Sequence, residues 1–263
     1  PHCLHWNPRL MRLRNRSAVT RWFIAGGAVA AALSLVMIIA PEYANAQRSW
    51  RRGGGAVHER DIFPGETFTF CRLRYTSAGG WGRGDWSTDY PESDQHFSLR
   101  LEELTTIRVN KLPNSEHLPR ARQYHHAVVD LTDDAIFDYP FVYMLEVGRL
   151  QFSQEEAERL RSYLLRGGFL MVDDFWGSRE WANWEMQIGQ VFDPEIYPMK
   201  ELELDHPIFN MVFELKEKPQ VPSINHWFSS GGDTSERGYD SREPHYLGIE
   251  DPETKRLMVL VCH

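Results

Sequence analysis

The stretch FVYMLEVGRLQFSQEEAERLRSYLLRGGFLMVDDFWG, residues 141–177, contains a complete strand–helix–strand pattern. Residues 141–146 and 169–172 are apolar runs of strand length. Between them, Ser153 and Glu156 have the spacing of a helix-capping box, and a pair of glycines ends the helix. Two strands joined by a helix in this way pair in parallel. The stretch therefore predicts an α/β fold with a parallel sheet and flanking helices.

Further elements are predicted on both sides of this unit. The run TFTFCRLRY, residues 67–75, is typical of a strand because it is rich in aromatic and β-branched residues. A helix is expected from Ser93, a suitable N-cap, because apolar residues recur after it at helical spacing. The other predicted elements are a strand at 127–131, a helix at 178–191, and two strands at 246–249 and 257–262 separated by the turn Asp251-Pro252-Glu253.

Residues 11–46 have the three parts of a bacterial-type secretory signal. An arginine-rich segment is followed by 19 uncharged residues, Trp22 to Ala40, and then by Pro41. Ala44-Asn45-Ala46 supplies the small residues that a signal peptidase requires. The uncharged run is almost long enough to span a bilayer, so residues 22–40 could instead be a membrane anchor. The Ala-x-Ala site favours cleavage and export to the periplasm or the extracellular space.

The charge distribution restricts the class of partner. Residues 1–46 contain five Arg, no Lys and one Glu, a charge of +4; the whole chain carries −8, which leaves −12 on residues 47–263. So acidic a surface repels nucleic acid and anionic lipid headgroups. We therefore expect no nucleic-acid partner, and contact with a membrane only through the N-terminal segment.

Composition divides the chain into three regions. Residues 1–46 form an N-terminal extension with the signal peptide, residues 47–62 a glycine-containing flexible linker, and residues 63–263 the α/β domain. Because the sequence stops inside the apolar run 257–262, we interpret the domain as incomplete at its C-terminus. The Cys-x-x-Cys and His-Glu-x-x-His patterns typical of zinc sites do not occur, and we expect no metal and no cofactor.

A glycine-dense loop that follows the first predicted strand is one candidate site. It has neither the Gly-Lys-Ser/Thr of a P-loop nor the spacing of a dinucleotide fingerprint. Ligands of α/β proteins bind beyond the carboxyl ends of the strands, where this loop is expected. The alternative is a structural loop in which glycines form turns and tryptophans cover the core. The candidate ligand-binding residues are Trp81, Arg83, Asp85, Asp89, Tyr90 and Asp94.

A second candidate follows the strand at 169–172. Asp173 and Asp174 are adjacent carboxylates that would repel each other in a dry site, raising one pKa or attracting a cation. In a solvated loop they would do neither. We interpret both loops as following neighbouring parallel strands, which would place Asp89, Tyr90, Asp94, Asp173, Asp174 and Trp176 around one crevice. His226, in a compact polar and aromatic group with Asn225 and Trp227, is a further candidate.

Residues 66–263 resemble a bacterial family, the domain of unknown function numbered four-one-five-nine. The resembling stretches are the opening strand, GGWGRGDWSTDYPESDQHF at 79–97, LLRGGFLMVDDFWG at 164–177 and DHPIF at 205–209. This resemblance implies an exported protein with the flavodoxin-like fold of class I glutamine amidotransferases. It also implies envelope or membrane partners related to aerotolerance and von Willebrand type A domains. No catalytic residue follows from it.

The amidotransferase fold carries its nucleophilic Cys on a tight turn between a strand and a helix, flanked by small residues. Here the corresponding strand continues into Asp173-Asp174 without a Cys, and bulky Val172 and Trp176 flank Asp174. We therefore expect no glutaminase activity. Two hypotheses follow: an exported, non-catalytic envelope module that binds a ligand or a protein, or a hydrolase that uses Asp carboxylates, with or without a metal.

Overall fold

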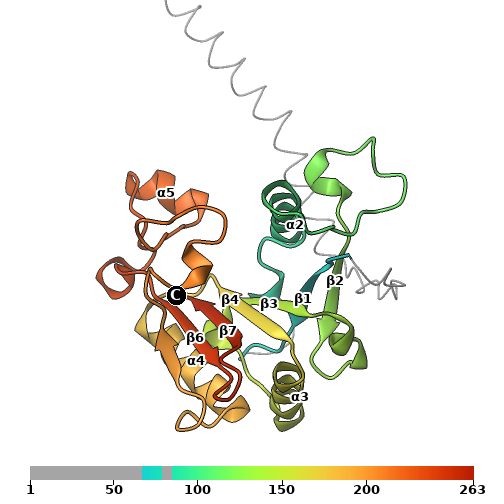
Figure 1. Cartoon of the computed structure of the whole chain (residues 1–263). Coiled ribbons are helices and arrows are strands. Elements are labelled where there is room, and N and C mark those ends of the chain that lie inside the picture. Colours follow the sequence, from blue (N-terminus) through green and yellow to red (C-terminus); the bar gives the residue numbers. More distant parts are fainter. Residues whose placement is uncertain (1–66, 79–84) are drawn as a thin grey trace, which may run out of the picture. The chain divides into compact units, whose positions relative to one another are not determined.

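A seven-stranded sheet with the order β2-β1-β3-β4-β7-β6-β5 is the centre of the computed structural model, which describes residues 67–78 and 85–263 (Figure 1). Strands β2, β1, β3, β4 and β7 are parallel; β6 is antiparallel to β7, and β5 to β6. The predicted α/β class is confirmed, with a sheet that is mostly parallel. The strands are β1 (Phe70–Arg74), β2 (His126–Asp130), β3 (Phe141–Leu145), β4 (Phe169–Asp173), β5 (Met199–Glu201), β6 (Tyr246–Glu250) and β7 (Leu257–Cys262).

The predicted strand–helix–strand unit is confirmed as β3, α3 (Gln154–Leu165) and β4. The two strands are parallel and pair from Phe141 with Phe169 to Leu145 with Asp173. The capping box is present as well: Ser153 Oγ accepts from Glu156 N at 3.2 Å, and Glu156 Oε2 accepts from Ser153 N at 2.7 Å. The local signals in this stretch therefore agree with the tertiary structure.

The helix predicted from Ser93 begins one residue earlier, as α2 (Glu92–Leu104). Its N-cap is Pro91, which makes no side-chain cap hydrogen bond. The hydroxyl of Ser93 instead donates to Asp89 O at 3.1 Å and accepts from the buried Arg72 side chain at 2.5 Å. The N-cap prediction was wrong because Ser93 already lies inside the first turn, where its N–H donates to Asp89 O at 2.9 Å.

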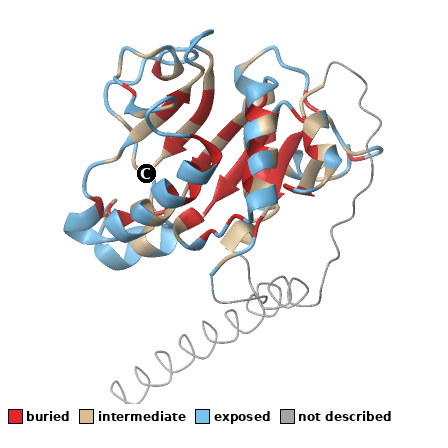
Figure 2. Ribbon diagram, turned by 90° about the horizontal axis from the view of Figure 1, so that it is seen from below, coloured by how far each residue is buried: buried red, intermediate tan, exposed pale blue. Residues whose placement is uncertain are grey.

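The helices cover the two faces of the sheet unequally. Leu160 of α3 and Trp184 of α4 (Gly177–Val191) belong to the main core cluster with Val142 and Leu170. On the opposite face, α2 packs through Phe97, whose ring centroid lies 5.1 Å from that of Phe70. Helix α5 (Ile224–Ser230) lies on the same side of the sheet as α2 (Figure 1). The central strands β1 and β3 are therefore mostly buried, whereas the edge strand β5 is mainly exposed, and the helices expose their outer surfaces (Figure 2).

One feature of the strand order was predicted wrongly. The glycine-dense loop follows β1 and the Asp173-Asp174 turn follows β4, but these strands are not neighbours, because β3 lies between them. Arg72 of β1 pairs with Tyr143 of β3, and β3 then pairs with β4. All three strands are parallel, so both loops still emerge at the same edge of the sheet.

Several predictions concern residues that lie outside the described part of the chain. They include the signal peptide or anchor, the linker at 47–62, and Trp81 and Arg83 of the glycine-dense loop. Within residues 67–78 and 85–263, no helix has both the length and the hydropathy that a bilayer span requires.

Candidate functional site

Acidic residues stand at the carboxyl ends of two adjacent strands. Glu146 directly follows β3, and Asp173 and Asp174 end and follow β4. Glu146 and Asp174 have left-handed backbones, with φ of 53° and 54°, and so does Asp89, with φ of 53°. Few residues other than glycine adopt this conformation, and such residues are concentrated at binding and catalytic sites. Asn114 and Lys255 share this conformation, so it supports a site here only together with the acidic side chains.

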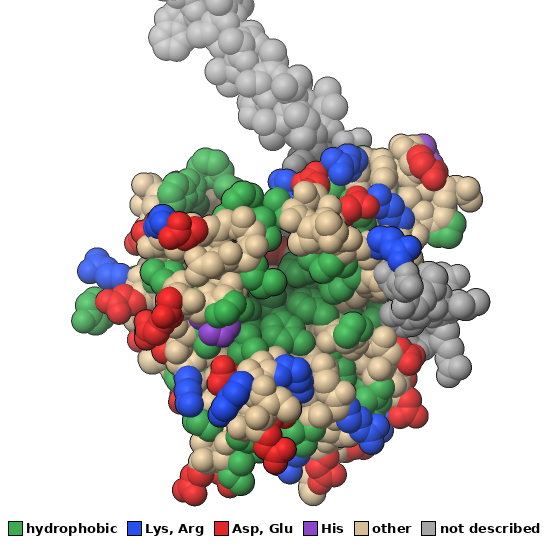
Figure 3. All heavy atoms as spheres, viewed as in Figure 1, with side chains coloured by type: hydrophobic (Ala, Val, Ile, Leu, Met, Phe, Trp, Pro, Cys, Tyr) green, Lys and Arg blue, Asp and Glu red, His purple; other side chains and the backbone are tan. Residues whose placement is uncertain are grey.

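A pocket of about 520 Å³ opens at this edge. Its floor is the face of β3, β4 and β7 that the helices leave uncovered, including Met171 and Leu260. One wall is the start of α2 with Asp89, and the other is segment 208–223. Figure 3 shows this face hollowed, with hydrophobic side chains between the parts of the chain that carry α2 and α5. We call it the carboxyl-edge pocket.

Four of the candidate residues lie together in the lining of this pocket: Asp89, Asp173, Asp174 and Trp176. Asp174 accepts a hydrogen bond from Trp176 Nε1 at 3.1 Å, which orients its carboxylate. Asp173 accepts one from the hydroxyl of Tyr143, which lies on β3 two residues before Leu145, the residue paired with Asp173. The two predicted loops thus contribute carboxylates to one pocket.

Asp94 is placed differently from the prediction. It is fully buried, forms an ion pair with Arg72, and does not line the pocket. Arg72 Nε donates to both carboxylate oxygens of Asp94, at 3.0 and 3.2 Å. Its Nη1 donates to the carbonyl oxygens of Trp86 and Thr88, each at 2.8 Å. This ion pair fastens the loop to the sheet and so positions Asp89.

The remaining candidates that the structure describes, Asp85, Tyr90 and His226, also lie outside the pocket lining. Asp85, in the 3-10 helix η2 (Asp85–Ser87), pairs with Arg149. The hydroxyl of Tyr90 lies 3.1 Å from His126 Nε2. His226 is in α5, three residues beyond the end of the lining segment 208–223. Because these side chains lie outside the lining, the observed pocket contains fewer of the candidate residues than the predicted crevice.

Burial shifts the titration of Asp173. It raises the pKa of this carboxyl group from 3.8 to about 7, against the hydrogen bond from Tyr143, which lowers it. The charge of Asp174 raises it further, and that of Arg72 lowers it. The raised pKa predicted for one of two adjacent carboxyl groups is therefore present, but burial contributes more to it than the charge of Asp174 does.

Two neighbouring acids have raised pKa values for the same reason. Burial raises the pKa of Glu146 to about 8, and the charges of Asp174, Glu180 and Asp85 add to this effect. The pKa of Asp174 is raised by burial and by Asp89. Carboxyl groups whose pKa lies near neutral pH, as for Asp173 and Glu146, can both donate and accept protons at that pH.

Glu146, Tyr143 and Arg72 were missed as parts of this site. Glu146 had a usable signal, because an acidic residue directly follows an apolar strand there. Arg72 also had a signal, because it is a charged residue between the apolar residues Cys71 and Leu73 of a predicted strand. Tyr143 had none, because an aromatic residue in a buried strand is usually part of the core.

Among residues 67–78 and 85–263, no group of three or more His, Cys, Asp or Glu side chains has an arrangement that could hold a metal ion.

Cys262 and His263 line the carboxyl-edge pocket beside the acids. Burial raises the pKa of the Cys262 thiol, which keeps it protonated. Cys262 is therefore a neutral group in the lining that also contains the carboxylates.

The sequence was compared with known protein families and with curated proteins. No curated protein matches it. The family model described as "Domain of unknown function (DUF4159)" matches residues 69–263, which include every described strand and helix. The chain therefore belongs to the DUF4159 family.

Proposed function

We propose that this chain is a binding module whose carboxyl-edge pocket takes an organic cation, such as a primary amine with an apolar body. One observation carries the proposal: the described lining has three carboxylates, Asp89, Asp173 and Asp174, and no Lys or Arg. A cation neutralises the repulsion between these groups, whereas an anion would increase it.

The walls of the pocket suit the same ligand. Tyr143, Trp176 and Tyr246 line it, and the faces of such rings attract a nearby ammonium group. Met171 and Leu260 on the floor offer an apolar surface to the rest of the ligand. A few polar groups within an apolar pocket are the usual composition of a small-molecule site.

We expect the pocket to distinguish three ligands of similar shape: 2-phenylethylamine, 2-phenylethanol and 3-phenylpropionate. The amine should bind most tightly at pH 8, the alcohol more weakly and the carboxylate least. Asp174→Asn should weaken amine binding at least about tenfold, because a charge-assisted hydrogen bond is lost. Asn tolerates the left-handed backbone at this position. Calorimetric titration measures all three affinities.

Two controls make this result specific. Glu185→Gln removes the same charge from the exposed surface of α4 and should leave amine binding unchanged. Amine binding should also strengthen between pH 6 and pH 8, because bound protons on Asp173 compete with the cation. Equal affinity for the amine and the carboxylate, or an equal loss in both variants, would refute the proposal.

The alternative function is hydrolysis, and the pKa of about 7 for Asp173 favours it. A general base works best when its pKa lies near the working pH. Tyr143 holds the carboxyl group in place by its hydrogen bond. Turnover of a chromogenic ester, phosphate or glycoside that disappears in Asp173→Asn would support hydrolysis over simple binding.

We also infer a flavodoxin-like arrangement. The order β2-β1-β3-β4 continues with the parallel strand β7, which occupies the fifth position of that fold. Asp174 lies in the turn between β4 and α4, where amidotransferases carry their nucleophile, and a carboxylate there supports the expectation that glutaminase activity is lost. Partners in the cell envelope are part of the same proposal.

Export is the last part of the proposal, and it is supported by the pattern at residues 11–46. When the chain is expressed in a bacterium from Met11, we expect cleavage after Ala46. N-terminal sequencing of the exported protein should then begin at Gln47. Ala46→Phe should block this cleavage, because the peptidase needs a small residue there. A membrane-bound product that retains Arg12 would show that the segment is an anchor.

A further inference from the structure

A second pocket, of about 550 Å³, lies on the other side of strands β6 and β7. It is lined by the start of α4, by the 3-10 helix η7 (Gly238–Ser241) and by the strand segment around Leu247. Leu247 and Tyr246 point to opposite faces of the sheet, so this pocket and the carboxyl-edge pocket open on different faces and share only His263, which follows β7 at the sheet edge. We call it the α4 pocket.

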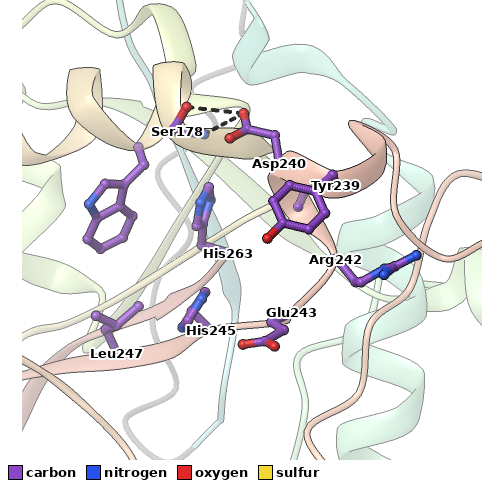
Figure 4. A pocket seen from close by; sticks show the side chains of 10 residues that line it. Ser178, Tyr239, Asp240, Arg242, Glu243, His245, Leu247 and His263 are labelled. Atoms are coloured by element: carbon purple, nitrogen blue, oxygen red, sulfur yellow. Dashed lines mark hydrogen bonds between the residues drawn. The ribbon is translucent and has the colours of Figure 1, made fainter.

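Aromatic rings surround the α4 pocket. Figure 4 shows Tyr239, His245 and His263 directed toward one space. The ring of His263 packs 5.1 Å from that of Trp181 and 4.6 Å from that of Phe175, so it is held rigidly. Tyr239 is 91% exposed and packs against nothing that fixes it as part of the core. Its ring face is therefore available to a ligand.

Polar groups of both signs complete the lining. Asp240 Oδ2 accepts from Ser178 N at 2.9 Å and from Ser178 Oγ at 3.1 Å, which fixes it at the start of α4 (Figure 4). Arg242 and Glu243 have no hydrogen-bond or ion-pair partner among the residues that the structure describes. An arginine only donates and a carboxylate only accepts. The lining thus offers unused donors and acceptors within one pocket.

The orientation of His263 adds another acceptor. Its Nδ1 lies 3.1 Å from Phe175 O, and a carbonyl oxygen can only accept, so Nδ1 carries the hydrogen. Burial lowers the pKa of His263, which keeps the ring neutral. Nε2 is then an acceptor. A ligand that fits this pocket needs hydroxyl groups, which donate and accept alike.

We propose that the α4 pocket binds a saccharide ring. The polarised C–H face of a sugar packs against the electron-rich face of an aromatic ring, here Tyr239. Its hydroxyl groups donate to Glu243 and His263 Nε2 and accept from Arg242. A purely anionic ligand would meet Asp240 and Glu243, and a purely cationic one would meet Arg242, so a neutral ligand fits best. This inference does not depend on the amine proposal.

Saturation-transfer NMR with cellobiose, chitobiose and maltose tests the inference. We expect the wild-type chain to transfer saturation to the ring C–H groups of at least one of these sugars. Tyr239→Ala should weaken that binding roughly tenfold, since it removes the stacking surface. Because Tyr239 is so exposed, its removal should not disturb the fold, and thermal unfolding checks this.

Two further variants separate the alternatives. Phe228→Ala removes another exposed aromatic ring, 76% exposed in α5 and outside the pocket, and should bind sugar as the wild type does. Asp174→Asn should also bind sugar normally, whereas it loses amine binding. Absence of transfer to all three sugars would overturn the inference, as would an equal loss in Phe228→Ala. Displacement of the sugars by glycine would assign a zwitterion site and overturn it too.

Discussion

Replacing Arg72 by Met is expected to lower the free energy of unfolding by about 3–5 kcal/mol, because it leaves the Asp94 carboxylate buried without its counter-charge. The same change removes the donors to Trp86 O and Thr88 O. The loop that carries Asp89 would then lose its attachment to β1. Urea unfolding monitored by tryptophan fluorescence measures the loss, and amine binding should fall with it.

The neighbouring Arg74 is a matched control for this prediction. It lies two residues further along β1 and pairs with Asp130, but both side chains are about 40% exposed, at 39% and 41%. Arg74→Met should therefore cost less than about 1 kcal/mol. If Arg72→Met does not fold, Asp94→Asn tests the same pair with little change in shape, and it should also be strongly destabilising because it leaves the buried Arg72 guanidinium without its counter-charge. Equal losses for Arg72→Met and Arg74→Met would contradict the assignment of the buried ion pair.

The strand–helix–strand unit could be predicted because its signals are local. Ser153 and Glu156 determine where α3 begins, and the apolar runs on either side have room for only one strand each. The hairpin of β6 and β7 was equally accessible, since a short turn at Asp251 separates two apolar runs. In these segments the sequence pattern and the tertiary contacts favour the same structure.

The order of the strands could not be predicted in the same way. Whether β3 or β4 pairs with β1 depends on contacts such as Arg72 with Tyr143, which are far apart in the sequence. Every parallel strand here has buried apolar residues, so hydrophobicity alone does not distinguish the neighbours. The two loops nevertheless meet, because parallel strands end at one edge whatever their order.

The candidate site was predictable where chemistry follows directly from position. Asp173 and Asp174 follow an apolar strand, and the carboxyl end of such a strand is where ligands bind. Asp94 looked equivalent in the sequence, but its carboxylate is used by an arginine 22 residues earlier. A charged residue within an apolar strand requires a buried partner, and this rule could have linked Arg72 to Asp94.

Asp173→Asn is expected to make the protein more stable at pH 8, and this is the clearest sign that the carboxyl group is retained for function. The folded-state pKa of Asp173 is about 7, above its ordinary 3.8. Between about pH 4 and pH 7 the folded state therefore holds a proton that the unfolded chain has released. Stability contributed by this group is lost as the pH rises through that window, and above it the loss is complete.

Asn at position 173 avoids this loss, because it is neutral at every pH and its side-chain oxygen still accepts from Tyr143. A shift from about 4 to about 7 corresponds to at most about 4 kcal/mol. The group lines an open pocket and water screens part of the effect, so we expect a gain of about 2 kcal/mol at pH 8 and almost none at pH 4. Urea unfolding at both pH values measures the difference.

Glu146, with a pKa of about 8, contributes a similar pH dependence to both proteins, so only the difference between variant and wild type reports on Asp173. Glu185→Gln, on the exposed surface of α4, should change stability by less than about 0.5 kcal/mol at either pH. A less stable Asp173→Asn protein at pH 8 would mean that the carboxylate forms a favourable structural contact. A more stable protein that no longer binds the amine would show that this carboxylate destabilises the fold and serves the pocket.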